Sequence, residues 1–168
     1  MLTELVEISE GVHALDASGV VTSDDYAQVF APLVDRVRRE GQRLRLLYQF
    51  GPGFTRLTPG ALWADSTLGA QYLPLLDGCA IVSDIDWIRE PARGIARWMP
   101  CPARVYANNQ RDEAAAWLAA LPQCQRPSTS QVLRAYVGGT GGFVASLGKL
   151  FILDRVAIRT RHGRGRHR

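Results

Sequence analysis

Residues 12–50 have the sequence VHALDASGVVTSDDYAQVFAPLVDRVRREGQRLRLLYQF, and this stretch decides the fold because its hydrophobic period changes twice. Apolar and polar residues alternate over 12–17, which is typical of a half-buried strand. From Tyr26 to Val37 the apolar residues instead recur with helical spacing, and Gly41 closes the pattern. The mostly apolar run 44–50 follows, as expected of a central strand. The stretch therefore predicts a strand, a helix and a second strand.

Similar patterns on both sides of this unit predict the rest of the fold. Thr22, three residues before Asp25, predicts a capped start for the first helix. The order of strands and helices along the chain, ββαβαβαβα, then predicts an α/β fold with a mixed, mainly parallel five-stranded sheet and helices packed on it. The other predicted elements are a strand at 5–8, a loop at 51–57, a helix through 62–72 capped by Thr58, a strand at 79–83, a helix capped by Asp86 and ended by Pro100, a strand at 103–106 and a helix at 112–121.

The overall composition is that of an ordinary packed domain. The chain has 168 residues, of which 46% are hydrophobic and 21% charged, and this excludes wholesale disorder and collagen-like repeats. No run of residues is long and apolar enough to predict a transmembrane helix. Acidic residues within 1–10 argue against a secretory signal. We therefore expect a cytoplasmic protein.

Charge divides the chain into two parts. Residues 1–125 hold eleven arginines and fifteen acidic residues, a net charge of −4, whereas 126–168 hold nine basic residues and Asp154, a net charge of +8. A turn-rich stretch around Pro127 marks the boundary. The predicted organisation is a domain at 1–122, a linker at 123–131 and a basic, partly apolar extension at 132–168, with an amphipathic helix over 143–157.

Residues that could carry catalysis are scattered. The chain has three cysteines without a CxxC spacing, and none stands beside a histidine, which argues against a disulfide framework and a zinc site. Cys79 is expected to be a small core residue, and His13 to be packed or solvated. Asp84 and Asp86 are better explained by helix capping than by a metal site. The Gly-rich stretch 138–142 lacks the lysine of a phosphate loop. We predict neither an enzyme nor a cofactor or metal.

Four separated motifs resemble those of the SpoIIAA-like (STAS-like) family and occur in the same order. They are GVVTSDDY at 19–26, GALWAD at 60–65, VSDIDWIR at 82–89 and the pair Met99-Pro100, so the resemblance covers about 1–121. It implies a STAS-like α/β fold, similar also to the core of SEC14 (CRAL-TRIO) lipid carriers. It further implies a non-enzymatic domain that binds apolar ligands, or associates with membranes, through its second and third helices.

One departure from anti-sigma-factor antagonists concerns regulation by phosphorylation. Those proteins carry a phosphorylatable serine in an Asp-Ser-Ser/Thr-Gly turn before the second helix, and the corresponding stretch 54–60 lacks this motif. Thr58 is the candidate phosphoacceptor there, although a helix cap beside proline also accounts for it.

The candidate ligand site combines the 51–57 loop with the second and third helices. These segments carry large apolar residues that either line a pocket or form ordinary core packing. The residues are Phe54, Leu57, Leu62, Trp63, Leu68, Trp87, Ile88, Ile95, Trp98 and Met99.

Two groups of arginines are candidate contacts for an anionic surface. Arg89, Arg93 and Arg97 are spaced by four residues and form one row on a helix. Each cation near an anionic membrane contributes about 1 kcal/mol, while the alternative for this row is a solvated helix face. The second group closes the chain and consists of Arg159, Arg161, Arg164, Arg166 and Arg168.

These observations predict a non-catalytic domain that binds an apolar small molecule or lipid, or an anionic membrane surface at the periphery of the membrane. Two alternatives stay open. One is a regulatory module of the anti-sigma-factor-antagonist type that docks a protein partner or a second copy of itself. The other, less favoured, is association of the basic tail with nucleic acid.

Overall fold

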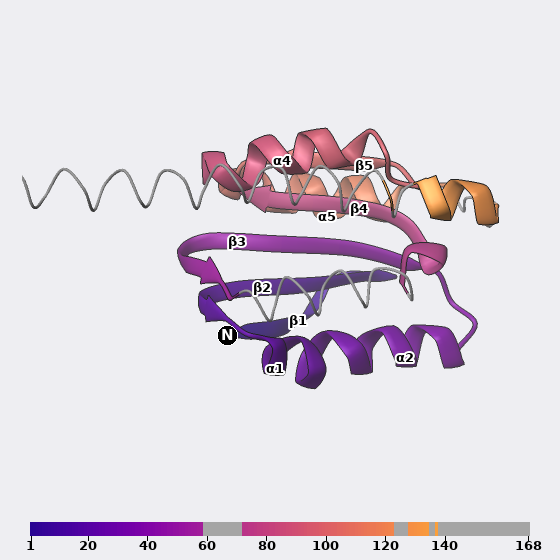
Figure 1. Cartoon of the computed structure of the whole chain (residues 1–168), viewed down its shortest axis with the longest axis horizontal. Helices are drawn as coiled ribbons and strands as arrows, with labels where there is room; N and C mark the ends of the chain where they lie inside the picture. The colour runs from indigo at the N-terminus through magenta and orange to yellow at the C-terminus, as the bar shows by residue number, and fades with distance from the viewer. Residues whose placement is uncertain (59–71, 123–127, 135–136, 138–168) are drawn as a thin grey trace, which may run out of the picture.

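The computed structural model describes residues 1–58, 72–122, 128–134 and 137, and its centre is a single sheet (Figure 1). The strand order is β1-β2-β3-β4-β5. The strand β1 pairs antiparallel with β2, and the remaining neighbours pair in parallel. The predicted α/β class and the opening hairpin are therefore confirmed. The strand bounds are Leu2–Ser9, Val12–Val21, Leu44–Leu57, Leu76–Ser83 and Ala103–Tyr106.

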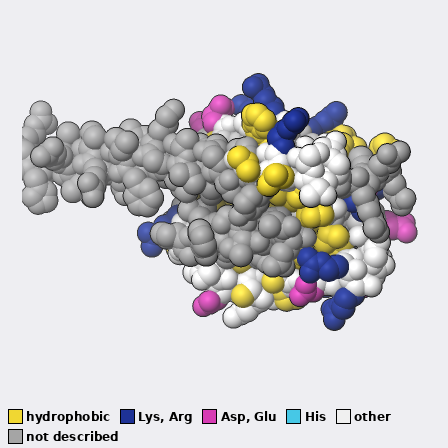
Figure 2. All heavy atoms as spheres, turned by 45° about the vertical axis from the view of Figure 1, so that its right-hand side comes forward, with side chains coloured by type: hydrophobic (Ala, Val, Ile, Leu, Met, Phe, Trp, Pro, Cys, Tyr) yellow, Lys and Arg dark blue, Asp and Glu magenta, His cyan; other side chains and the backbone are white. Residues whose placement is uncertain are grey.

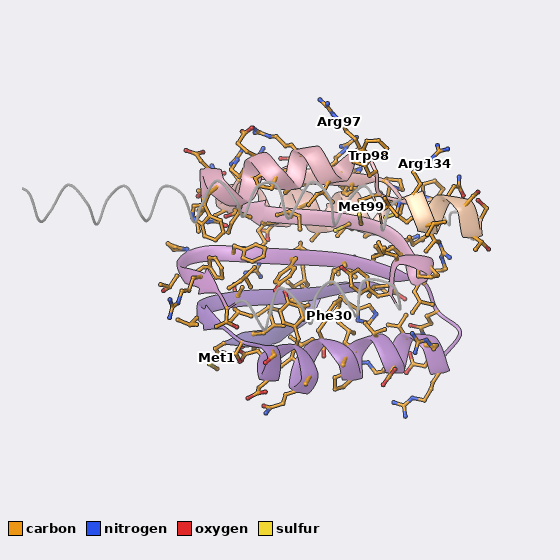
Figure 3. All side chains as sticks on the ribbon, viewed as in Figure 1. Met1, Phe30, Arg97, Trp98, Met99 and Arg134 are labelled. Atoms are coloured by element: carbon orange, nitrogen blue, oxygen red, sulfur yellow. The ribbon has the colours of Figure 1, made fainter. Side chains whose placement is uncertain are left out.

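Helices cover both faces of the sheet. The segments α1 (Ser23–Asp25), the π-helical turn Tyr26–Phe30 and α2 (Ala31–Arg39) lie against the β1 side, and α4 (Asp86–Ala96) lies against β4 and β5 (Figure 1). Together they face the larger core cluster, into which Phe30 projects (Figure 3). The helix α5 (Arg111–Ala119) packs on the opposite face and buries Leu118 against Leu47 and Val82.

The first helical segment begins as predicted. Thr22 and Asp25 form a reciprocal capping box: the Thr22 N–H donates to Asp25 Oδ2 at 2.7 Å, and the Asp25 N–H donates to Thr22 Oγ1 at 3.3 Å. The helical path continues to Arg39 through the π-helical turn. Gly41 follows with φ +66°, a left-handed conformation that glycine adopts without steric cost.

The predicted loop at 51–57 is wrong, because β3 continues through it to Leu57. The pairing of β3 with β2 passes register shifts on both sides of Gly19 and resumes as far as Val21 and Leu57. Irregularities of this kind accommodate glycine and proline within a strand. Phe54 lies in this extension with its side chain buried, so the long-range pairing also contributes to the core.

The boundaries of α4 also differ from the prediction. Ile85 is the N-cap and Asp86 the first helical residue, so Asp86 does not cap the helix, although its charge still lies at the positive end of the helix dipole. The helix ends at Ala96, ahead of Pro100, because the chain tightens there and the Trp98 N–H donates to the Ile95 carbonyl at 2.8 Å.

The C-terminal part is described only in short stretches. Residues 129–134 are helical, and Val132 packs against the larger core cluster. The predicted helices at 62–72 and 143–157 fall outside the described residues, except for Tyr72. The division at 122 and 131 stays a prediction. Within the described part of the chain, no helix combines the length and apolar character needed to cross a membrane.

Candidate functional site

A cavity of about 380 Å³ lies between α4 and the sheet. Its floor follows from strand alternation, because every second residue of a strand points to the same face. Leu46, Tyr48 and Phe50 contribute from β3, Cys79 and Ile81 from β4, and Ala103 and Val105 from β5. The remaining described lining residues come mainly from α4 and the adjoining turns: Tyr26, Thr55, Arg56, Leu57, Tyr72, Trp87, Ile88, Pro91, Ala92, Ile95, Ala96, Met99 and Arg104.

The helix α4 roofs this cavity without sealing it. Although the helix has an apolar stripe, none of its residues is buried. Ile88 and Ile95, on the stripe, are only half-buried, because part of the space beneath them is unfilled. By contrast, α5 buries Ala114, Ala115 and Leu118 on the other face. The two faces of the sheet therefore differ: one is closely packed, and the other leaves room for a molecule.

A pair of tyrosine hydroxyl groups supplies a polar feature in this apolar setting. Tyr26 projects from the π-helical turn and Tyr48 from β3, and their hydroxyl oxygens lie 2.9 Å apart in a hydrogen bond. Both side chains are buried, and both residues line the cavity. The bond therefore joins the layer of helices to the sheet beside the cavity.

Aromatic rings connect the floor of the cavity to its roof. Tyr48 stacks on Phe50 with ring centroids 4.4 Å apart, and Phe50 meets Phe54 edge-on at 5.0 Å. Phe54 in turn lies 5.8 Å from Trp87 on α4. This chain of rings holds the N-terminal end of α4 over the sheet. On the molecular surface, Figure 2 shows hydrophobic side chains in a band with arginines above and below it.

Comparison with known proteins agrees with this geometry. The SpoIIAA-like family model matches residues 12–119, which is more than half of the chain. The chain belongs to the SpoIIAA-like family. Membership supports an interaction or regulatory role rather than catalysis. No curated protein matches the chain.

A solved structure shares the SpoIIAA-like fold. The crystal structure of an uncharacterised protein with this fold from Shewanella loihica PV-4 superposes with a TM-score of 0.55 at 20% sequence identity. The match covers 70% of this chain and 93% of that protein. At this level of identity the likeness establishes the fold alone.

Half of the predicted ligand residues line the cavity of this SpoIIAA-like domain. They are Leu57, Trp87, Ile88, Ile95 and Met99. Phe54 is not among the described lining residues, although its ring lies 5.8 Å from that of Trp87, and Trp98 is exposed beyond the end of α4. Leu62, Trp63 and Leu68 lie outside the described residues, so their part in the site stays a prediction.

Sequence reasoning missed the floor and the tyrosine pair. The alternation along β3, β4 and β5 was a usable signal, because every second residue had to share a face with α4. No sequence pattern indicated that Tyr26 would reach Tyr48, since this contact depends on where the helix packs across the sheet.

The arginine row on α4 is largely engaged in local contacts. Arg89 donates to the Ser83 carbonyl at 3.0 Å and lies 3.7 Å from Asp84, and Arg93 pairs with Glu90 at 2.8 Å. Arg97 is exposed at the C-cap and points away from the sheet (Figure 3). Within the described ranges, Arg97 alone of these three has no acidic partner. The tail arginines at 159–168 fall outside those ranges.

The other candidate residues take part in the packing and hydrogen bonding of the fold. Asp84 accepts a hydrogen bond from the Asn108 N–H at 3.1 Å, and the described residues contain no group of three metal-binding side chains. Cys79 and Cys101 are buried. Thr58 is half-buried, and its N–H donates to the Val21 carbonyl at 2.9 Å, at the end of the β2–β3 pairing.

His13 lies in a partly buried charged cluster at the start of β2. Its Nδ1 is 3.9 Å from Glu4 Oε1, and the same carboxylate forms an ion pair with Arg36. Burial and the Arg36 charge lower the pKa of His13, and the opposing effect of Glu4 is smaller. His13 lies outside the cavity lining given above.

Proposed function

We propose that this SpoIIAA-like domain binds an apolar small molecule or lipid-like ligand in the cavity beneath α4. The observation that supports the proposal is an unfilled space of about 380 Å³, surrounded by aromatic and aliphatic side chains, in a domain whose other face is closely packed. Its volume falls within the range of about 300–1,000 Å³ that is common for small-molecule sites. Filling it would remove apolar surface from water on both the ligand and the domain.

Blocking the cavity from its roof tests this proposal. Ala92 on α4 lines the cavity, so Ala92→Phe places a ring in the space that the ligand would take. Ala116→Phe on the exposed face of α5 is the matched control, because it adds the same bulk away from the cavity. Titration with an apolar fluorescent probe such as N-phenyl-1-naphthylamine then measures affinity.

We expect the wild type and Ala116→Phe to bind the probe with affinities within about twofold of each other, and Ala92→Phe to bind at least about tenfold more weakly. Native mass spectrometry of freshly purified protein should also show a bound apolar molecule, lost in Ala92→Phe. Equal affinity in all three proteins would rule out the cavity as the binding site.

A second candidate function is contact with an anionic membrane surface. Trp87 and Trp98 are 40% and 50% exposed, and Arg97 lies between them in sequence at the end of α4. Tryptophan favours the headgroup region of a membrane, and arginine binds phosphate. Because Arg89 and Arg93 already lie beside acidic residues, we rank this function below ligand binding.

Vesicle sedimentation separates the two functions. Surface contact predicts binding to vesicles that contain phosphatidylglycerol, no binding to phosphatidylcholine vesicles, and a loss of at least about fivefold in Trp98→Ser/Arg97→Gln. Arg38→Gln/Val20→Ser is the control, since it removes one arginine of α2 and one exposed apolar side chain of β2. Equal binding by both variants would exclude α4 as the contact surface.

The regulatory alternative and the nucleic-acid alternative rest on residues with less structural support. A partner-docking module would use Thr58 as its phosphoacceptor, and the absence of phosphate at Thr58 in protein from its native cell would remove that version. Nucleic-acid binding would depend on the arginines of 159–168, and unchanged retention on DNA or RNA after their deletion would exclude it.

A further inference from the structure

The floor and the roof of the cavity are aromatic at one end and aliphatic at the other. Because β4 and β5 are parallel, α4 runs back over the sheet and begins at the carboxyl ends of these strands. At that end Phe50 lies on the floor, paired with the last residue of β4, and Trp87 lies in the roof. At the opposite end Leu46 lies on the floor, and Ile95 and Met99 lie above it, with Met99 near the C-terminal end of α4 (Figure 3).

Trp87 is the last ring in the chain that runs from Tyr48 through Phe50 and Phe54. Its ring lies 5.8 Å from that of Phe54 with the two planes inclined by 38°, and this is its one ring contact within the described ranges. Phe54 is buried between two rings, whereas Trp87 is 40% exposed although it lines the cavity. Trp87 therefore has ring surface that a molecule in the cavity can cover.

An aromatic group would use this surface better than a saturated group of the same size. Two rings attract each other through offset or edge-to-face contact between the negative face of one and the positive edge of the other, in addition to the effect of the buried area. A cation over the ring would compete for the same face. In the described part of the chain the cation–ring contact is that of Arg104, whose guanidinium lies 4.8 Å from the ring of Trp117 on the α5 face of the sheet, and no cation lies over Trp87.

We infer that the cavity selects an apolar ligand with an aromatic group, which packs against Trp87 while the rest of the molecule lies along the aliphatic end. The inference rests on the proposed function and names the ligand class for the same site. A cavity of about 150 Å³ holds one benzene ring. The volume of about 380 Å³ therefore accommodates one ring with a short alkyl chain, or two fused rings.

The test uses two probes with the same chain, 4-phenyl-1-butanol and 4-cyclohexyl-1-butanol, which differ in an aromatic or a saturated ring. Trp87→Leu removes the indole ring and keeps an apolar side chain, and Trp87→Phe keeps an aromatic ring. Trp117→Leu is the matched control, because Trp117 lies on the α5 face and is not among the described lining residues. Calorimetry or ligand-observed NMR gives the affinity of each protein for both probes, and the ratio of the two affinities cancels the difference in hydrophobicity between the probes.

We expect the ratio of the phenyl-probe affinity to the cyclohexyl-probe affinity to fall about fivefold in Trp87→Leu. In Trp87→Phe and in Trp117→Leu the ratio should stay within about twofold of the wild-type value. An unchanged ratio in Trp87→Leu, or an equal fall in Trp117→Leu, would overturn the inference and leave the proposed function intact, because both probes would still bind. Failure of the wild type to bind either probe would contradict both.

A measurement on the wild type keeps the inference testable even if Trp87→Leu does not fold. The indole N–H resonance of Trp87, identified by its loss in Trp87→Phe, should shift on addition of the phenyl probe, because the ring current of a neighbouring aromatic group acts on it. The cyclohexyl probe should shift this resonance by less than half as much at equal occupancy. Equal shifts with the two probes would overturn the inference.

Discussion

At the scale of single residues, Asp77 at the start of β4 is a charged side chain buried in the described structure. Arg45 Nε lies 3.2 Å from its Oδ2, and Arg43 Nε lies 3.7 Å from its Oδ1. Arg45 also donates to the carbonyls of Ala119 and Leu121, at 2.9 Å and 2.7 Å. Asp77 therefore neutralises both arginines, of which Arg45 attaches the end of α5 to the sheet.

Asp77→Ala should lower the free energy of unfolding by about 3 kcal/mol, because it leaves two poorly solvated guanidinium groups without their carboxylate. Urea unfolding followed by circular dichroism measures the change. Asp35→Ala is the control, since its pair with Arg38 is exposed and should contribute less than about 1 kcal/mol. Similar losses of unfolding free energy in the two variants would show that the buried Asp77 cluster stabilises the fold no more than the exposed pair does.

His13 gives the fold a dependence on pH. Because burial and Arg36 lower its pKa below the ordinary value of 6.5, the folded protein favours neutral His13. As the pH falls through 6.5, the unfolded chain takes up the proton first and stability decreases. Asp25, whose pKa is held below 3.8 by bonds from Thr22 and Leu2 despite the opposing effect of burial, titrates at lower pH. The free energy of unfolding should therefore fall between pH 7.5 and pH 5.5, and less so in His13→Gln. The same pH dependence in both proteins would assign it to other groups.

At the scale of elements, features that depend on nearby residues were predicted well from the sequence, and features that depend on long-range pairing were predicted poorly. The cap at Thr22, the stripe from Tyr26 to Val37 and the end at Gly41 are all encoded within a few residues, and the structure confirms each of them. The extension of β3 to Leu57 depends instead on pairing with β2, more than thirty residues away in sequence. The cavity has the same origin: three of the predicted ligand residues, Trp87, Ile88 and Ile95, lie on α4, but which strand residues face this helix depends on packing.

The capping box offers a prediction at this scale. Thr22→Ala removes the hydroxyl that accepts the Asp25 N–H, and it should lower the free energy of unfolding by about 1 kcal/mol. Ser23→Ala, one residue further on, serves as the control and should have a smaller effect. Chemical denaturation of both variants provides the measurement, and an equal effect would indicate that the cap is not a distinct source of stability.

At the scale of the whole molecule, the two faces of the sheet should differ in their dynamics. Because α4 has no buried residue and α5 has three, the local free energy of opening should be lower for α4. Hydrogen exchange followed by mass spectrometry should show faster exchange at 86–96 than at 111–119. An apolar ligand should slow exchange at 86–96 and leave 111–119 nearly unchanged. Equal protection of both helices without ligand would contradict the packing difference on which the proposed function rests.

Because α4 is incompletely packed, selection for a stable fold and selection for a particular ligand can act on different residues of this domain. In a closely packed core, changing the size of a side chain disturbs folding, so such positions diversify slowly. Ile88, Ala92 and Ile95 face unfilled space, and exchanges of size among them should alter which molecule fits while the sheet and α5 keep the domain folded. A duplicated copy of this domain could thus acquire a new ligand through a few substitutions on one helix.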